Sequence, residues 1–230
     1  LSTYSLLAAV FLIFISFFLQ SIAWSKLFEI DKPRFLIKAW LSSNIAKYIP
    51  LKVGVIIKRI NEIKSHHPTL SGKLITKNYF IEQVIIIVTA VLISICYFVE
   101  TLLNFSIIFL ISVFLMEIVQ GRSVKVKLFR PFSIYLLGQF FHLTALYTVS
   151  SAIFDSNSLE PASIYILSTI IGMFVFTAPS GIGVRESTFL FFLAESFDPT
   201  SAITFIVVVR ILTTIIDILT YLLSMLFTKK

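Results

Sequence analysis

The sequence predicts an all-α, polytopic membrane protein with about five full transmembrane helices and two re-entrant helical hairpins. Hydrophobic residues occupy 57% of the 230 positions and charged residues only 13%, about half the charged share of a soluble domain. Several apolar runs reach the roughly 20 residues that a helix needs to cross a bilayer. Two other apolar stretches are interrupted by proline, glycine and charged residues, so neither forms one straight spanning helix.

The apolar runs come in a definite order along the chain. Five are uninterrupted and are predicted to span the membrane: residues 4–22, 79–99, 102–119, 132–154 and 200–227. The two interrupted stretches are residues 35–57, broken at Pro50 and Gly54, and residues 162–197, broken at Pro179. Irregular backbone at membrane depth is tolerated only where protein or a water-filled cavity covers it. Both interrupted stretches should therefore line a cavity.

The basic residues lie on one side of this topology. Of the 19 Lys and Arg residues, 17 fall in the stretch 26–77, in the loop 122–130 or at the C-terminal end. Cytoplasmic loops carry an excess of Lys and Arg, so this side, with the C-terminus, is predicted to be cytoplasmic. The net charge of +7 then faces anionic lipid headgroups. Nucleic-acid binding is the rival interpretation, but the charges flank helices instead of forming a stripe on a soluble face.

The two interrupted stretches resemble each other. Pro-x-x-x-Gly-Val occurs at Pro50 and again at Pro179, an offset of 129 residues. We predict one membrane domain, residues 1–230, with two repeat units over residues 4–119 and 132–227. Loop charges predict opposite orientations for them, the inverted repeat found in many transporters; chance similarity is the alternative. Because the chain starts without Met, we expect residues upstream of Leu1 to be missing.

The segment 178–186, Ala-Pro-Ser-Gly-Ile-Gly-Val-Arg-Glu, is the most informative. Pro179, Gly181 and Gly183 end one helix and let the chain turn, after which Arg185 and Glu186 open the next. The N-terminus of a helix and an arginine together favour an anion such as phosphate. In the alternative, Arg185 and Glu186 only pair with each other or extend to the membrane interface. Charge at mid-membrane costs about 2.5–3.5 kcal/mol on insertion scales, which favours a function.

The segment from Pro179 to Glu186 resembles a motif of the lysylphosphatidylglycerol synthase transmembrane region, a flippase-like family that includes the membrane half of the multiple peptide resistance factor. Ser-Asn-Ile-Ala-Lys-Tyr-Ile-Pro at 43–50, then Lys-Val-Gly at 52–54 and Arg59, resembles the family's first motif. The resemblance implies a prokaryotic plasma-membrane protein that moves a phospholipid or a lipid-linked carrier between leaflets. The positions it implicates are Asn44, Lys47, Pro50, Arg59, Pro179, Gly181, Gly183, Arg185 and Glu186.

Other polar residues fall within the predicted helices. Arg210 and Asp217, two turns apart on one face of the last run, can pair with Glu186 and Arg185 across the cavity or form a structural bridge. Glu82 can neutralise Lys47 or Arg59. Gln139 and His142 share one face of the fourth helix; they face the cavity or make helix–helix hydrogen bonds.

These residues give three hypotheses on function. The first is a lipid flippase or transporter for anionic or phosphate-bearing lipids. The second is a non-catalytic membrane partner of a glycosyltransferase or an aminoacyl transferase, which would dock on the basic loop 58–77. The third is a membrane transferase in its own right. Because no nucleophile–base motif or metal-ligand spacing is present, we expect no catalytic residue, metal or cofactor.

Overall fold

The computed structural model describes residues 2–28, 30, 33–49, 53–98, 128–175, 178–194 and 196–226. These residues form helices and contain no strand. The helices are α1 (Thr3–Ser25), α2 (Arg34–Ser43), η1 (Asn44–Tyr48), α3 (Val53–His66), α4 (Gly72–Phe98), α6 (Phe129–Phe154), α7 (Glu160–Phe174), η2 (Pro179–Gly181), α8 (Val184–Leu193) and α9 (Pro199–Leu226).

Four of these helices contain a segment that is long and apolar enough to cross a membrane: Thr3–Ser25, Gly72–Ser94, Phe129–Phe154 and Pro199–Leu226. They correspond to four of the five predicted spanning runs. The fifth run, residues 102–119, lies outside the described residues. The chain is therefore a helical membrane protein with several spanning helices.

Short polar side chains set the starts of three long helices. Ser2 caps α1 by accepting a hydrogen bond from the backbone N–H of Ser5 at 3.1 Å. Ser71 accepts from Leu74 at the start of α4, also at 3.1 Å, and Asp198 accepts from Ser201 at 2.9 Å, just before α9. These caps satisfy N–H groups that have no partner within the helix.

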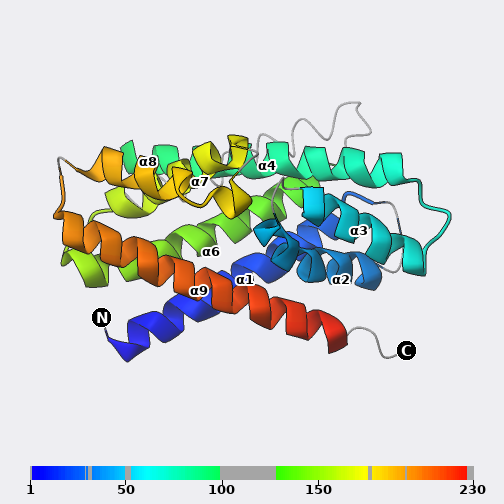
Figure 1. Cartoon of the computed structure of the whole chain (residues 1–230), viewed down its shortest axis with the longest axis horizontal. Helices are drawn as coiled ribbons and strands as arrows, with labels where there is room; N and C mark the ends of the chain where they lie inside the picture. Colours follow the sequence, from blue (N-terminus) through cyan, green and yellow to red (C-terminus); the bar gives the residue numbers. More distant parts are fainter. Residues whose placement is uncertain are drawn as a thin grey trace.

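Each interrupted stretch folds into two α-helices that pack against each other, with a short η helix between them in the sequence. In the first, α2 and η1 lead to α3, which returns along α2. In the second, α7 and η2 lead to α8, which returns along α7. The two hairpins enter from opposite ends of the molecule, and their turns lie near its middle (Figure 1). Each is followed by a long helix, α4 in one case and α9 in the other.

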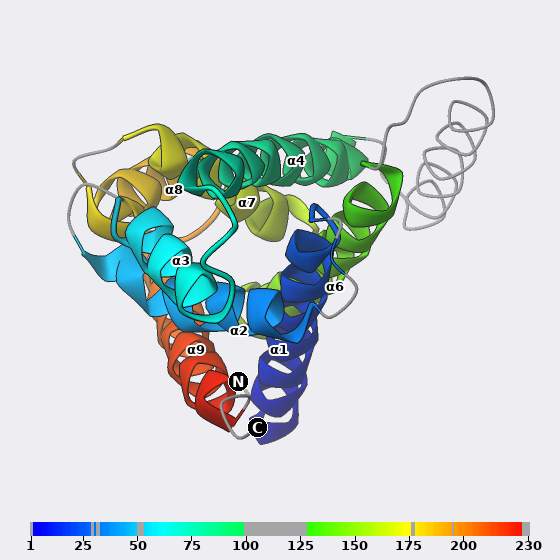
Figure 2. The same ribbon diagram turned by 90° about the vertical axis from the view of Figure 1, so that its right-hand side faces the viewer.

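The long helices surround the two hairpins. α1 and α6 pack extensively and run in opposite directions, whereas α9 contacts α2, α6 and α8. Seen from the end, α4 lies on the side opposite the chain termini, α2 lies between α1 and α9, and α3 lies between α2 and α4 (Figure 2). The largest apolar core joins α1, α4, α6, α7, α8 and α9, and a smaller one joins α2 to its neighbours.

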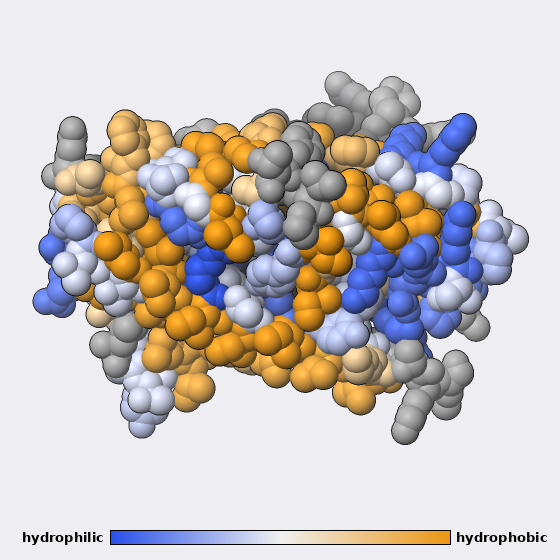
Figure 3. Space-filling model, in the orientation of Figure 1, coloured by the Kyte–Doolittle hydropathy of each residue, from blue (hydrophilic) through white to orange (hydrophobic). Residues whose placement is uncertain are grey.

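The surface has the reverse polarity of a soluble protein. Large apolar side chains face outward, including Phe191, which is 77% exposed, whereas Glu82 and Asp217 are buried. Hydrophilic residues gather at the end formed by α2 and α3, next to an apolar middle (Figure 3). An extensive exposed apolar surface indicates contact with lipid, in agreement with the spanning helices.

Candidate functional site

The turns of the two hairpins meet in the middle of the molecule, where η1 contacts η2. Local chain geometry explains the turn of the second hairpin. Gly181 and Gly183 have positive φ angles of 70° and 86°, which glycine adopts without steric cost. A Cβ on Gly181 would also lie only 3.2 Å from the carbonyl oxygen of Gly172 on α7. The predicted role of Gly181 and Gly183 in turning the chain is confirmed.

Lys47, on η1, forms an ion pair with Asp217 on α9. The Lys47 Nζ atom lies 2.6 Å from Asp217 Oδ2, and the Tyr48 hydroxyl donates to the same oxygen at 2.7 Å. Asp217 is completely buried, and its Oδ1 atom has no hydrogen-bond partner among the described residues. The α2–α3 hairpin is therefore bound to α9 through its tip.

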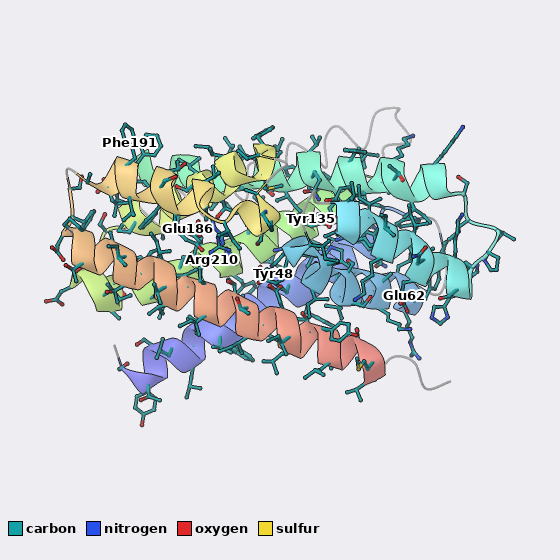
Figure 4. The ribbon with its side chains drawn as sticks, viewed as in Figure 1. Tyr48, Glu62, Tyr135, Glu186, Phe191 and Arg210 are labelled. Atoms are coloured by element: carbon teal, nitrogen blue, oxygen red, sulfur yellow. The ribbon has the colours of Figure 1, made fainter. Side chains whose placement is uncertain are left out.

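Glu186, on α8, pairs with Arg210 on α9. The Nε atom of Arg210 donates to Glu186 Oε1 at 2.6 Å, and a second guanidinium nitrogen pairs with the same oxygen. The other oxygen, Oε2, accepts a hydrogen bond from the backbone N–H of Gly183 at 2.6 Å. Glu186 thereby caps the N-terminus of its own helix, α8. Figure 4 shows Glu186, Arg210 and Tyr48 together near mid-length. Glu186 thus occupies part of the helix N-terminus that we expected to bind a ligand anion.

Arg185 has much weaker partners than the other two cations. Its Nε atom lies 3.8 Å from Glu186, whose oxygens already bind Arg210 and Gly183. One Nη atom donates to Thr169 at 3.4 Å, and the guanidinium lies over the ring of Tyr165 at 5.1 Å. Within the described part of the chain, its buried Nε atom donates no hydrogen bond. Arg185 is thus the cation most available to a ligand.

These groups surround one cavity of about 180 Å³ between the hairpin tips, α1, α4, α6 and α9. Lys47, Arg185 and Arg210 line it together with polar side chains and an apolar portion of wall. The polar lining comprises Gln20, Tyr48, Gln139, His142, Tyr165, Thr169, Ser180 and Thr213. The volume is several times the roughly 30 Å³ that a water molecule occupies in the liquid, enough for a small polar headgroup.

The charges at the cavity do not balance. Three cations, Lys47, Arg185 and Arg210, face two carboxylates, Asp217 and Glu186. Among the described residues, one positive charge is therefore left over inside the protein. An uncompensated charge in such a place is costly, and an anion bound beside Arg185 would remove that cost.

Arg59 does not belong to this cavity. It is 3% exposed and forms an ion pair with Glu82, which is 1% exposed. Its Nε atom donates to Ser43 at 2.9 Å, and its guanidinium lies 4.5 Å from the ring centre of Trp24, with the rings of Trp40 and Tyr79 also close. The expected neutralisation of Arg59 by Glu82 is confirmed. In this structure Arg59 is a buried structural residue and not a contact of the cavity.

Other predicted residues differ in their outcome. The Arg210–Glu186 pair is confirmed, but the expected pairing of Asp217 with Arg185 is wrong, because Lys47 is closer. Lys47, a predicted binding residue that also belongs to the basic stretch 26–77, lines the cavity. Asn44 is buried at the start of η1. Gly54 lies in the first turn of α3, beside η1. Pro179 begins η2 after α7 has already ended at Phe174. Pro50 lies outside the described residues.

Some residues that line the cavity were not predicted from the sequence. Tyr48, Gln20 and Tyr165 line the cavity. Tyr48 could have been found as the neighbour of Lys47 at a helix break, and Gln20 as a lone amide in an apolar run. Tyr165 carries no such signal in the sequence. Gln139 and His142 do line the cavity, the first of the two alternatives above.

Comparison of the chain with protein-family models, curated proteins and solved structures gave no match. Among the described residues, no group of three His, Cys, Asp or Glu side chains could hold a metal ion. The function must therefore be argued from the cavity itself.

Proposed function

We propose that the protein is a lipid flippase or transporter that holds the phosphate of a lipid headgroup in the central cavity. The observation that carries this proposal is the surplus positive charge at Arg185, beside a cavity with both polar and apolar walls. A phosphate diester carries one negative charge and several acceptor oxygens, so it suits a guanidinium that lacks a full set of partners. Lys47 and the polar lining would complete its coordination.

The shape of the protein also supports this proposal. Helical hairpins that enter from opposite sides and meet near the middle of the membrane are typical of transporters. We infer that α2–α3 and α7–α8 are re-entrant, that the two halves form an inverted repeat, and that the basic end is cytoplasmic in a prokaryotic plasma membrane. The similarity of residues 43–54 and 179–186 to the flippase-like lysylphosphatidylglycerol synthase transmembrane family points the same way.

Reconstituted protein provides the test. Vesicles would contain a fluorescent phospholipid or a fluorescent polyprenyl phosphate, and transfer between leaflets would be measured by quenching from outside. We expect transfer by the wild type, a loss of at least about tenfold in Arg185→Gln, which removes one charge-assisted contact, and little change in Lys73→Gln, which alters an exposed cation on α4. Absence of transfer of both lipids, beside an active scramblase control, would contradict the proposal.

The basic end favours one alternative, a membrane partner of a glycosyltransferase or an aminoacyl transferase. Lys64, Lys73 and Lys77 are all exposed around the α3–α4 connection, where they could bind an acidic protein surface. Reversal of all three charges should then prevent co-purification of such an enzyme while transfer of lipid, measured in vesicles, stays unchanged. If both properties are unaffected, this surface has no role in docking.

A further inference from the structure

A second hollow lies on the outer side of α3, separate from the central cavity. It has a volume of about 510 Å³ and follows α3 from its first residues to Ser65. We call it the α3 groove. Val53 and Ser65 mark its ends on α3; twelve residues of helix at about 1.5 Å each give about 18 Å. This is close to one leaflet of hydrocarbon, about 15 Å.

The polarity of the α3 groove changes along its length. Near the hairpin tip it is lined by Ile49, Val53 and Ile57, which are 53%, 48% and 54% exposed. Toward the basic end it is lined by Lys58 and Asn61, among other polar residues. The surface is correspondingly apolar in the middle of the molecule and hydrophilic at that end (Figure 3). A phospholipid in the leaflet of the basic end has the same gradient, with its acyl chains toward the middle.

The polar end of the groove favours an anionic headgroup. Glu62, the groove's acidic residue in the described part of the chain, pairs with Lys38 and so is neutralised. The Lys58 ammonium group lies 4.5 Å from the ring centre of Tyr221, and Lys64 is exposed about one and two-thirds turns further along α3. A positive charge therefore remains where the headgroup would lie.

The groove shares a wall with the central cavity. Ala46 and Ile49 line the groove, whereas Lys47 and Tyr48, between them in the sequence, line the cavity. Gly54 permits this close arrangement, because a Cβ there would be only 2.9 Å from the Ala46 carbonyl oxygen. A lipid in the groove would thus lie against the hairpin tip that carries Lys47.

We propose that the α3 groove binds one anionic phospholipid of the basic-end leaflet, with an acyl chain along Ile49, Val53 and Ile57 and the headgroup at Lys58. This lipid occupies a waiting position next to the central cavity. The inference rests on the proposed function through the re-entrant placement of α2 and α3, which puts the groove in contact with lipid.

The test uses phosphatidylglycerol or phosphatidylcholine with a diazirine in the acyl chain, incorporated into nanodiscs with the whole chain. After illumination, labelled peptides are identified by mass spectrometry. We expect labelling around Val53 and Ile57 to exceed that around Ile211, an α9 residue with the same 54% exposure. Labelling should be stronger with phosphatidylglycerol. Equal labelling at the two sites would indicate nonspecific annular lipid only and would overturn the proposal.

Two variants localise the bound lipid. Ile57→Trp should fill the groove and reduce its labelling, whereas Ile211→Trp should not. Lys58→Gln should lower the ratio of groove labelling by phosphatidylglycerol to labelling by phosphatidylcholine about fivefold, which is the contribution of one lysine at an anionic surface. An unchanged ratio would overturn the assignment of the headgroup. Arg185→Gln should abolish transfer between leaflets but preserve groove labelling, so failure of the transport proposal and failure of this one are distinguishable.

Discussion

Replacement of Glu82 by glutamine tests whether the Arg59–Glu82 pair stabilises the packing of α2, α3, α4 and α6. Glu82 accepts hydrogen bonds from Trp40 at 2.5 Å and Tyr135 at 3.0 Å while it pairs with Arg59. Glutamine has nearly the same shape, and its carbonyl oxygen can still accept from Trp40 or Tyr135. The substitution therefore removes the negative charge and leaves most of the packing intact.

The expected loss of stability is large because Arg59 stays positively charged in the variant. A buried ion pair that loses one partner costs about 3–5 kcal/mol, and a guanidinium does not release its proton inside a protein. For a chain of 150–250 residues, 1 kcal/mol corresponds to a Tm shift of roughly 2–4 °C. Glu82→Gln should thus lower the Tm by roughly 6–20 °C. Arg59→Met should cost less, since Trp40 and Tyr135 still donate hydrogen bonds to the remaining Glu82 carboxylate.

Thermal unfolding of the detergent-solubilised protein, followed by fluorescence-detected gel filtration, measures this difference. Glu62→Gln is the matched control, because the Lys38–Glu62 pair is partly exposed, with side-chain exposures of 11% and 22%. Because Glu62 is more exposed than Glu82, loss of its charge should cost less than loss of the charge of Glu82. If Glu82→Gln unfolded at the same temperature as Glu62→Gln, Glu82 would not be needed to stabilise the buried charge of Arg59. The reasoning would then be refuted.

Three further predictions concern the tip region and the topology. Gly181→Ala should lower the Tm more than Gly183→Ala. Both positions require positive φ, but only a Cβ at position 181 would contact another residue. Equal decreases in Tm would contradict the close packing of Gly181 on α7. Asp217→Asn should free its lysine partner and increase binding of phosphatidylglycerol to the detergent-solubilised protein about tenfold, measured by native mass spectrometry. Unchanged binding would oppose this view of the cavity. In a variant whose single cysteine has been replaced, Asp198→Cys should react with an impermeant thiol reagent in intact cells, whereas Lys73→Cys should react only after permeabilisation. The opposite result would invert the topology.

Local sequence predicts the helices and their interruptions well. A run of about 20 apolar residues has few alternatives to a spanning helix, and proline with glycine near residues 50 and 179 marks the breaks. The end of α7 is less predictable. The helix stops at Phe174, five residues before Pro179, and Gly172 packs against Gly181. That stop depends on contact with the returning chain, which a local pattern does not contain.

The partners of the charged residues are harder to predict than their presence in the membrane. Sequence spacing places Arg210 and Asp217 on one face of α9, but it does not decide which hairpin tip each one meets. The environment of Arg59 is a stronger case: the aromatic rings around it come from α1, α2 and α4. Residues so distant along the chain are brought together only by the packing of the whole domain.

The two hairpin tips present charges of opposite sign to the same helix. The tip at Lys47 provides a cation to Asp217, whereas the tip at Glu186 provides a carboxylate to Arg210, and both partners lie on α9. Because the tips are in contact, exchange to the alternative pairs, Lys47 with Glu186 and Arg210 with Asp217, would also be neutral. In either arrangement Arg185 remains the surplus cation. Among the described residues, the proposed need for an anion therefore follows from the number of charges at the cavity and does not depend on the particular side-chain conformations that form the pairs.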